Sequence, residues 1–241
     1  MKKEIKTYST PNALATAAAD FFLSMSQQAI KEKGRFFVAL SGGSTPKRLF
    51  KILSSEPYKS TIDWNNCFIF FGDERYVPHD HPDSNYRTAK ETLFNYVTCP
   101  AANIFAANTN GANANEDAAQ YEKTIYAQLG TPPEFDLIYL GLGPDGHTAS
   151  LFPGTTALEE QTSKVAAVYV DKLATWRITF TYPLLNAARH VMFLVEGEAK
   201  AQVLKEILVD EDMKHPAQGV KAEQVLHWYL DQQAASKLKT I

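Results

Sequence analysis

Three short, mostly apolar runs each end directly in a loop that contains glycine, and this repeated pattern constrains the fold most strongly. The runs cover residues 36–40, 67–71 and 136–140, and segments with helical patterns lie between them. Strands that are apolar on both faces are typical of parallel sheets with helices packed on each side. Ligands of such sheets bind beyond the carboxyl ends of the strands, where we expect these loops to lie.

Further elements extend the pattern into an α/β fold. Strands are predicted at 165–170, 177–182, 190–195 and 225–230. Helices are predicted to start near 45–46 and to cover 84–96, 115–129 and 199–208. Ser44 or Thr45, and Asp83 or Ser84, are the expected N-caps of the first two helices. No repeat or linker divides the chain, so we expect residues 1–241 to form a single domain. The predicted class is a Rossmann-like, mostly parallel sheet with helices on both faces.

Charge and cysteine content exclude several classes of function. The chain has 24 basic and 27 acidic residues and a net charge of −3, which does not favour nucleic acid or a membrane as a partner. Two cysteines are too few for a disulfide framework or a standard zinc site. Without an apolar leader or a run of about 20 apolar residues, we expect a cytoplasmic protein, either a monomer or a small homo-oligomer.

The loop Ser41-Gly42-Gly43-Ser44-Thr45-Pro46 follows the first apolar run and leads into a predicted helix. Its glycines let backbone N–H groups approach an anion, its hydroxyls add donors, and the helix N-terminus contributes partial positive charge. The Walker A ending is missing, so the loop does not indicate an NTPase. It indicates either an anion site or a tight, well-capped turn.

Charged residues follow the second run in the sequence Asp73-Glu74-Arg75. Carboxylates at this position would orient sugar hydroxyls, and the arginine would balance the charge of a bound substrate. A solvated salt bridge in the loop would account for the same residues. The position directly after a strand keeps Asp73 and Arg75 as candidates for the site.

The segment from Gly141 to Thr148, with the sequence GLGPDGHT, follows the third run. It formally matches G-x-G-x-x-G, but proline and aspartate lie inside the turn and no ribose-binding carboxylate follows at the usual distance. A nicotinamide cofactor is therefore not predicted. We expect the turn to present Asp145 and His147 at the edge of the sheet, where a histidine oriented by a carboxylate can accept a proton from water.

Two cations farther along the chain are candidates for binding a phosphate. Arg177 begins a predicted strand and Lys200 lies where the next helix begins, so both side chains are within reach of strand ends. Ordinary surface cations are the alternative. His79 and His81 suggest a metal, but no third ligand is apparent, and no metal site is expected.

Together and in this order, the motifs resemble those of the 6-phosphogluconolactonases over nearly the whole chain. The matching stretches are residues 40–46, 71–78 with 83–86, 141–154, 177–179 and 197–201. The resemblance implies a Rossmann-like fold shared with the glucosamine-6-phosphate deaminases. It also implies hydrolysis of 6-phosphogluconolactone to 6-phosphogluconate in the oxidative pentose phosphate pathway, with a phosphorylated sugar lactone as substrate and no metal or organic cofactor.

The resemblance also implies roles for individual residues. His147 looks like the general base, Asp145 like the carboxylate that orients it, and Arg75 like the group that steadies the substrate or the developing oxyanion. Asp73 lies in the same matching stretch as Arg75 and is a candidate for substrate binding. The phosphate site looks like a combination of the loop and two cations, namely Gly42, Gly43, Ser44, Thr45, Arg177 and Lys200.

Two other functions remain as alternatives. The related deaminases share the Asp-Gly-His turn, but they carry a glutamate just before the following proline, where this chain has Phe152, and usually Asp-Glu-Tyr in place of Asp-Glu-Arg. Both departures favour the lactonase. A non-catalytic sugar-phosphate sensor, as in effector-binding modules of transcription regulators, would carry a helix-turn-helix segment and a basic surface. The acidic net charge does not favour that alternative.

Overall fold

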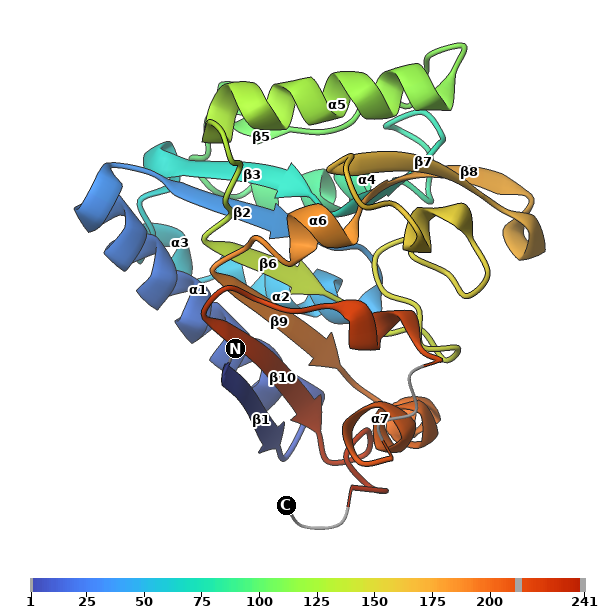
Figure 1. The fold of residues 1–241 in the computed structure, drawn as a ribbon. Helices are drawn as coiled ribbons and strands as arrows, with labels where there is room; N and C mark the ends of the chain where they lie inside the picture. Colours follow the sequence, from blue (N-terminus) through green and yellow to red (C-terminus); the bar gives the residue numbers. More distant parts are fainter. Residues whose placement is uncertain (1, 211–213, 239–241) are drawn as a thin grey trace.

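Seven parallel strands form the central sheet of the computed structural model, which describes residues 2–210 and 214–238 (Figure 1). The strands of both sheets are β1 (Lys2–Tyr8), β2 (Phe36–Leu40), β3 (Cys67–Phe71), β4 (Asp73–Arg75), β5 (Ile104–Phe105), β6 (Leu137–Leu140), β7 (Val165–Val170), β8 (Thr175–Phe180), β9 (His190–Val195) and β10 (Val225–Asp231). The α-helices are α1 (Pro11–Lys33), α2 (Ser44–Leu53), α3 (Tyr58–Thr61), α4 (Asn85–Ala89), α5 (Ala114–Leu129), α6 (Tyr182–Leu185) and α7 (Ala201–Leu208).

The strand order of the central sheet is β1-β10-β9-β6-β2-β3-β5, and every neighbouring pair is parallel. From β2 the chain moves outward through β3 to β5, then returns to β6 beside β2 and moves outward the other way. This is the doubly wound order 3-2-1-4-5-6 with β1 added at one edge. The reversal between β2 and β6 opens the crevice in which such sheets bind ligands, and the predicted fold class is confirmed.

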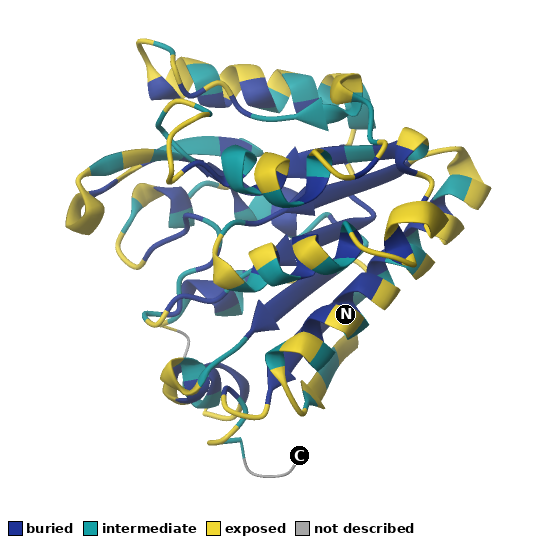
Figure 2. Cartoon of the chain, turned by 180° about the vertical axis from the view of Figure 1, so that it is seen from behind, coloured by how far each residue is buried: buried dark blue, intermediate teal, exposed yellow. Residues whose placement is uncertain are grey.

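Both faces of the sheet are covered at its centre, which explains why the central strands β2 and β6 are buried throughout. Successive side chains of a strand point to opposite faces. In β2, Phe36 and Val38 face the core formed with α1 and α2, whereas Phe37 and Ala39 face the core formed with α5 and the second sheet. Figure 2 shows the central strands buried and the outer sides of the helices exposed.

A second, antiparallel sheet of three strands, in the order β4-β8-β7, lies beside the first. The polar segment after β3, predicted as a loop, contains β4, because main-chain pairing with β8 replaces the apolar pattern that normally marks a strand. The N–H of Gly72 donates to the carbonyl of Leu40 at 2.8 Å, and the N–H of Phe180 donates to the carbonyl of Gly72 at 2.8 Å. These bonds join the two sheets directly beside the carboxyl end of β2.

Two predicted helix starts have different outcomes. Ser84 is the N-cap of α4, as predicted, and its hydroxyl accepts from the N–H of Arg87. The predicted caps of α2 were wrong, because Gly43 occupies that position with φ of 105° and Ser44 is already helical. The predicted helix at 84–96 ends as an α-helix at Ala89 and continues as a π-helical turn over Lys90–Phe94.

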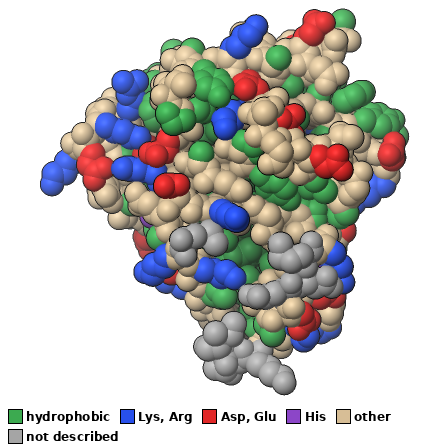
Figure 3. All heavy atoms as spheres, in the orientation of Figure 1, with side chains coloured by type: hydrophobic (Ala, Val, Ile, Leu, Met, Phe, Trp, Pro, Cys, Tyr) green, Lys and Arg blue, Asp and Glu red, His purple; other side chains and the backbone are tan. Residues whose placement is uncertain are grey.

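The surface drawn in Figure 3 carries acidic and basic side chains intermixed among its described residues. This mixture agrees with the small net charge of −3. Within residues 2–210 and 214–238, no helix is long and apolar enough to span a membrane.

A buried carboxylate ties together the amino ends of β2, β6 and β9. Asp136, which is 3% exposed and directly precedes β6, accepts a hydrogen bond from the N–H of Phe37 at 2.8 Å. Its other oxygen lies 2.8 Å from Nζ of Lys33 and 3.7 Å from Nη1 of Arg189. The guanidinium of Arg189 also contacts Glu134 at 3.2 Å. One carboxylate therefore contacts residues at or next to the starts of three neighbouring strands.

We expect Asp136→Ala to lower the free energy of unfolding by about 3–5 kcal/mol, because a buried N–H loses its acceptor and two cations each lose one carboxylate partner. Glu134→Ala is the matched control. Its carboxylate contacts the same Arg189 but is 46% exposed, so its loss should cost about 0–1 kcal/mol. Chemical denaturation measures both values, and equal losses would contradict the anchoring role of Asp136.

Candidate active site

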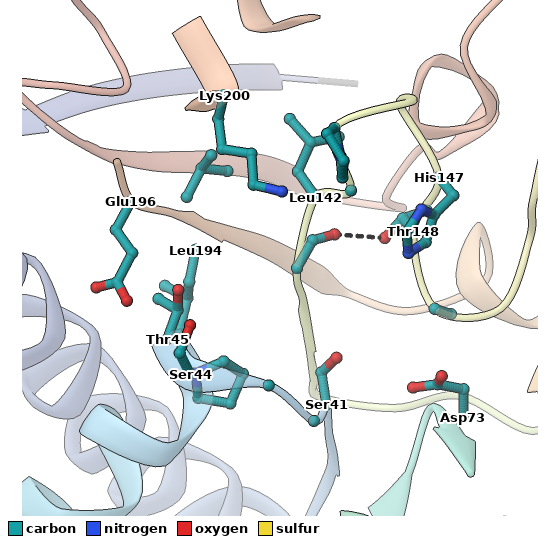
Figure 4. A pocket seen from close by; sticks show the side chains of 18 of the residues that line it. Ser41, Ser44, Thr45, Asp73, Leu142, His147, Thr148, Leu194, Glu196 and Lys200 are labelled. Carbon is teal, nitrogen blue, oxygen red and sulfur yellow. Dashed lines mark hydrogen bonds between the residues drawn. The ribbon is translucent and has the colours of Figure 1, made fainter. Parts of the chain in front are cut away.

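A cavity of about 270 Å³ lies beyond the carboxyl ends of the central strands, at the reversal between β2 and β6. Loops that follow β2, β3, β6 and β9 form its wall, as Figure 4 shows. Most of the predicted site residues line it, namely Gly42, Gly43, Ser44, Thr45, Asp73, Arg75, His147 and Lys200. Asp145 and Arg177 do not line the cavity themselves. Asp145 contacts His147, and Arg177 lies next to Arg75, and both of these neighbours line the cavity.

The loop after β2 presents the start of α2 to this cavity. Gly43 supplies no side-chain cap, and the first bond within the helix runs from the N–H of Lys47 to the carbonyl of Gly43. The N–H groups of Ser44 and Thr45 therefore stand at an uncapped helix N-terminus, which carries partial positive charge. Lys200 extends toward the same cavity from the opposite wall (Figure 4), and burial lowers its pKa. This end of the cavity suits a phosphate.

The two carboxylates after β3 have different roles because β4 is a strand. Alternation along β4 turns Asp73 toward the cavity and Glu74 into the protein. Glu74 is 1% exposed and accepts hydrogen bonds from the N–H groups of Asn85 and Tyr86 at 2.7 and 2.8 Å. Burial raises the pKa of Glu74, although these N–H donors act in the opposite direction. Glu74 therefore holds the start of α4, and only Asp73 reaches the cavity.

Asp73 is fixed by neighbours that the sequence analysis did not identify. The hydroxyl of Ser150 donates to Oδ2 of Asp73 at 2.8 Å, and the side-chain amide of Asn85 donates to its main-chain carbonyl at 2.9 Å. Asn85 also packs against Gly42 so closely that a Cβ there would lie 1.8 Å from Oδ1 of Asn85. The glycine thus allows the loop after β2 to approach Asn85, the residue that holds the main chain of Asp73.

Two arginines lie side by side on β4 and β8. Arg75 and Arg177 are direct partners in the strand register, and Nη1 of Arg75 donates to the carbonyl of Asp83 at 2.8 Å. Both Nε atoms are buried without a hydrogen-bond partner among the described residues. Burial, together with the charge of Arg75, lowers the pKa of Arg177. Paired guanidinium groups with unused donors favour an anion or a developing negative charge.

This pairing places Arg177 next to Arg75 and not in the wall that Lys200 and the loop after β2 form. The charges that act on Arg177 come from Arg75, Asp73, Glu74 and Asp83. Its assignment to the phosphate site stays a prediction.

The turn after β6 brings His147 and Asp145 together. Nδ1 of His147 lies 2.5 Å from Oδ1 of Asp145, where the ring N–H donates to the carboxylate. Nε2 is left as the ring nitrogen that can accept a proton. The imidazole stacks on Phe152 with ring centroids 4.0 Å apart. The sequence had indicated that Asp145 and His147 would meet in this turn, and their side chains do.

The charge states of this pair follow from burial and from its neighbours. Burial lowers the pKa of His147, and this effect outweighs Asp145, which acts to raise it. Burial opposes ionisation of Asp145, but hydrogen bonds from Lys172 and then from His147 hold its pKa well below the usual range. The site therefore contains a neutral imidazole beside an ionised carboxylate at neutral pH.

The backbone of the turn is shaped around the imidazole. The hydroxyl of Thr148 donates to the carbonyl of Gly141 at 2.9 Å (dashed in Figure 4), and the N–H of Gly143 donates to the carbonyl of His147 at 2.8 Å. A Cβ on Gly143 would lie 1.9 Å from Nδ1 of His147. No helix begins here, because Thr148 pairs with Leu151 in an isolated bridge. The strand-turn-helix context of a dinucleotide motif is thus absent from this segment.

Two further residues at the site were missed from the sequence. Glu196 directly follows β9, lines the cavity and lies 3.3 Å from Nε of Arg48. The sequence analysis looked for site residues directly after predicted strands. The same rule, applied to the strand that ends at Val195, could have identified Glu196. Lys172 contacts Asp145 from the turn between β7 and β8, and no local pattern marks it.

The described residues contain no group of three or more His, Cys, Asp or Glu side chains arranged to hold a metal ion. Nε2 of His79 lies 2.9 Å from the carbonyl of Ala107, and His81 lies beside Asp83. These contacts account for both histidines of the loop.

The fold and the site define a doubly wound α/β protein whose crevice brings together an uncapped helix N-terminus, a lysine and a histidine–carboxylate pair. A family model described as glucosamine-6-phosphate isomerases/6-phosphogluconolactonase matches residues 9–228, and the chain belongs to this family.

Individual relatives cover nearly the whole chain. It is 38% identical to the 6-phosphogluconolactonase of Nostoc sp. over 244 residues, with 99% of each chain covered. It is 43% identical to the 6-phosphogluconolactonase of Synechocystis sp. over 218 residues, with 88% of each covered. The structure of the 6-phosphogluconolactonase from Trypanosoma cruzi aligns with a TM-score of 0.87 at 30% identity, covering 99% of this chain and 98% of the other.

We expect Gly143→Ala to displace the imidazole of His147, because the added methyl group would occupy the space of Nδ1. The variant should stay folded but lose the His147–Asp145 hydrogen bond, which the downfield Nδ1 proton signal in NMR reports. Gly72→Ala is the matched control, since the nearest atom to its Cβ would be a carbonyl oxygen at an ordinary 3.7 Å. An unchanged proton signal in Gly143→Ala would contradict this account of the turn.

Proposed function

We propose that the chain hydrolyses 6-phospho-D-glucono-1,5-lactone to 6-phospho-D-gluconate in the oxidative pentose phosphate pathway of the cytoplasm. The observation that carries this proposal is the contact of His147 Nδ1 with the Asp145 carboxylate at the edge of a cavity that also contains Arg75. Burial, which lowers the pKa of His147, favours the neutral imidazole that a base requires. The names of the relatives support the same substrate.

The two ends of the cavity suit the two ends of this substrate. The phosphate would bind at the N-terminus of α2 through the N–H groups of Ser44 and Thr45, with Lys200 as a counter-charge. Gly42 and Gly43 keep that approach open. Asp73, held by Ser150, would accept hydrogen bonds from sugar hydroxyls. The lactone carbonyl would then lie between His147 and Arg75.

In the first step, Nε2 of His147 would take a proton from water while the water oxygen bonds to the lactone carbonyl carbon. The carbonyl electron pair moves onto its oxygen, and the resulting negative charge is stabilised by the guanidinium of Arg75. Arg177 adds positive charge from the next strand. Asp145 stabilises the imidazolium that forms on His147.

In the second step, the carbonyl re-forms and the bond between this carbon and the ring oxygen breaks. The leaving oxygen receives the proton from His147 and becomes a hydroxyl group, and the new carboxylic acid ionises in water. The histidine returns to its neutral form, so each group is restored after one turnover. No step requires a metal or an organic cofactor.

The contact between Phe152 and His147 favours this reaction over deamination. The deaminases are expected to have a carboxylate at this position to partner the histidine, whereas Phe152 offers an apolar ring face. An apolar face cannot accept a hydrogen bond from the imidazole. It does remove water from one side of the ring, which favours a neutral base.

We expect purified, chelator-treated protein to hydrolyse fresh 6-phosphogluconolactone well above its spontaneous rate of opening. It should release no ammonia from glucosamine-6-phosphate, because the residue beside His147 at position 152 is a phenylalanine and not a carboxylate. A coupled assay for 6-phosphogluconate, corrected with an enzyme-free blank, measures the first activity, and an ammonia assay measures the second. Comparable ammonia release would favour the deaminase alternative.

We expect His147→Ala to lower kcat by about 10²–10⁴-fold with a smaller change in KM, the range for loss of a placed general base. Only neutral histidine accepts a proton, and burial lowers the pKa of His147 below its usual 6.5. Wild-type kcat/KM should therefore be constant above about pH 6.5 and fall as the pH decreases below it.

The residual activity of His147→Ala should lack this acid limb. His81→Ala, in an exposed loop, is the control and should keep both the wild-type rate and the limb. Because the lactone opens by itself in alkali, each pH needs its own blank. A folded His147→Ala protein with nearly normal kcat would rule out the general-base assignment.

A further inference from the structure

A lysine from the second sheet contacts the histidine–carboxylate pair from outside the cavity. Lys172 lies in the short turn Asp171–Leu173 between β7 and β8, and its Nζ donates to Oδ2 of Asp145 in an ion pair. The other oxygen of Asp145 accepts from Nδ1 of His147. The carboxylate is therefore held on one side by a permanent cation and on the other by the imidazole.

A second contact holds Lys172 next to the imidazole. Its Nζ lies 4.6 Å from the ring centroid of Phe152, within the range of a cation–π interaction. Phe152 in turn stacks on His147. Lys172 thus reaches His147 along two paths, through Asp145 and across the ring of Phe152.

We infer that Lys172 is a positioning residue for His147, which fixes the orientation of the Asp145 carboxylate and keeps the imidazole in its neutral, proton-accepting form. The part of this inference that concerns catalysis rests on the proposed function. The coupling between Lys172 and His147 concerns the charge state of an imidazole, and it can be measured without any substrate.

The sign of the effect follows from the charges around the ring. An ionised carboxylate that contacts only His147 would stabilise the imidazolium. A carboxylate that also contacts a cation stabilises the imidazolium less. The positive charge of Lys172 also acts directly against a second positive charge nearby. The titratable and charged groups that face the pair come from several elements, namely Asp145 on the same turn, Asp73 on β4, Lys172 between β7 and β8, Lys200 before α7, and His215, whose Nδ1 lies 3.5 Å from the carbonyl of Asp145.

Among these groups, Lys172 opposes protonation of His147, whereas Asp145 and Asp73 favour it. The Lys172 side chain is 52% exposed, so solvent screens its charge and its removal should not threaten the fold. The expected effect is therefore a moderate change in the titration of His147.

The test compares Lys172→Met, Lys172→Arg and Lys221→Met with the wild type. The His147 ring is titrated by NMR in the absence of substrate, and kcat/KM for the lactone is measured over the same pH range. In Lys172→Met the His147 midpoint should rise by about half a unit to one unit, because a nearby positive charge is lost. The acid limb should move by the same amount, which lowers kcat/KM about three- to tenfold at acid pH.

Lys172→Arg keeps the charge and should restore the wild-type midpoint and limb. Lys221→Met removes an exposed lysine elsewhere and should change neither. An unchanged His147 midpoint and an unchanged limb in Lys172→Met would overturn the inference. A shifted midpoint in a protein whose activity shows no dependence on His147 would support the coupling and refute the base assignment, so the two failures are distinguishable.

Discussion

Parallel pairing of β2 with β6, at the point where the chain reverses its direction across the sheet, is the constraint on which the site depends. Because all seven strands run the same way, their following loops gather at one edge. Asp136 bonds to the main chain of Phe37 and so sets the register of these two strands. A shift by one residue would exchange the two faces of β2 and separate the loop at Gly42 from the turn that carries His147.

The cavity carries positively charged groups although the net charge of the chain is −3. An uncapped helix start and Lys200 supply positive potential at one end, and the paired Arg75 and Arg177 supply it from the second sheet. Between them, burial keeps His147 neutral although Asp145 is ionised. The positively charged groups and the histidine–carboxylate pair are thus separated in space, and each depends on different elements of the fold.

The sequence identified those parts of the site that depend on local rules. Loops after apolar strands, and the two-residue spacing of Asp145 and His147, follow from chain geometry. The N-cap of α2 was missed because a glycine, Gly43 with φ of 105°, occupies that position in place of a residue with a hydroxyl group. Lys172 and the Arg75–Arg177 pair depend on the docking of a second sheet, and its strand β4 is too short and polar to show a pattern. Contacts between distant segments leave no local signal.

The surroundings of His147 are set by residues that lie outside the central sheet. The central sheet sets where the turn after β6 lies, whereas the groups around the imidazole come from the rest of that loop and from the turn between β7 and β8. Phe152 covers one face of the ring, and Lys172 occupies the far oxygen of Asp145. A carboxylate at position 152 would place negative charge beside the ring and favour the imidazolium, whereas the aromatic ring and the shared carboxylate favour a neutral base. Changes in these peripheral residues would therefore be expected to alter the proton affinity of His147 without moving the strand that positions it.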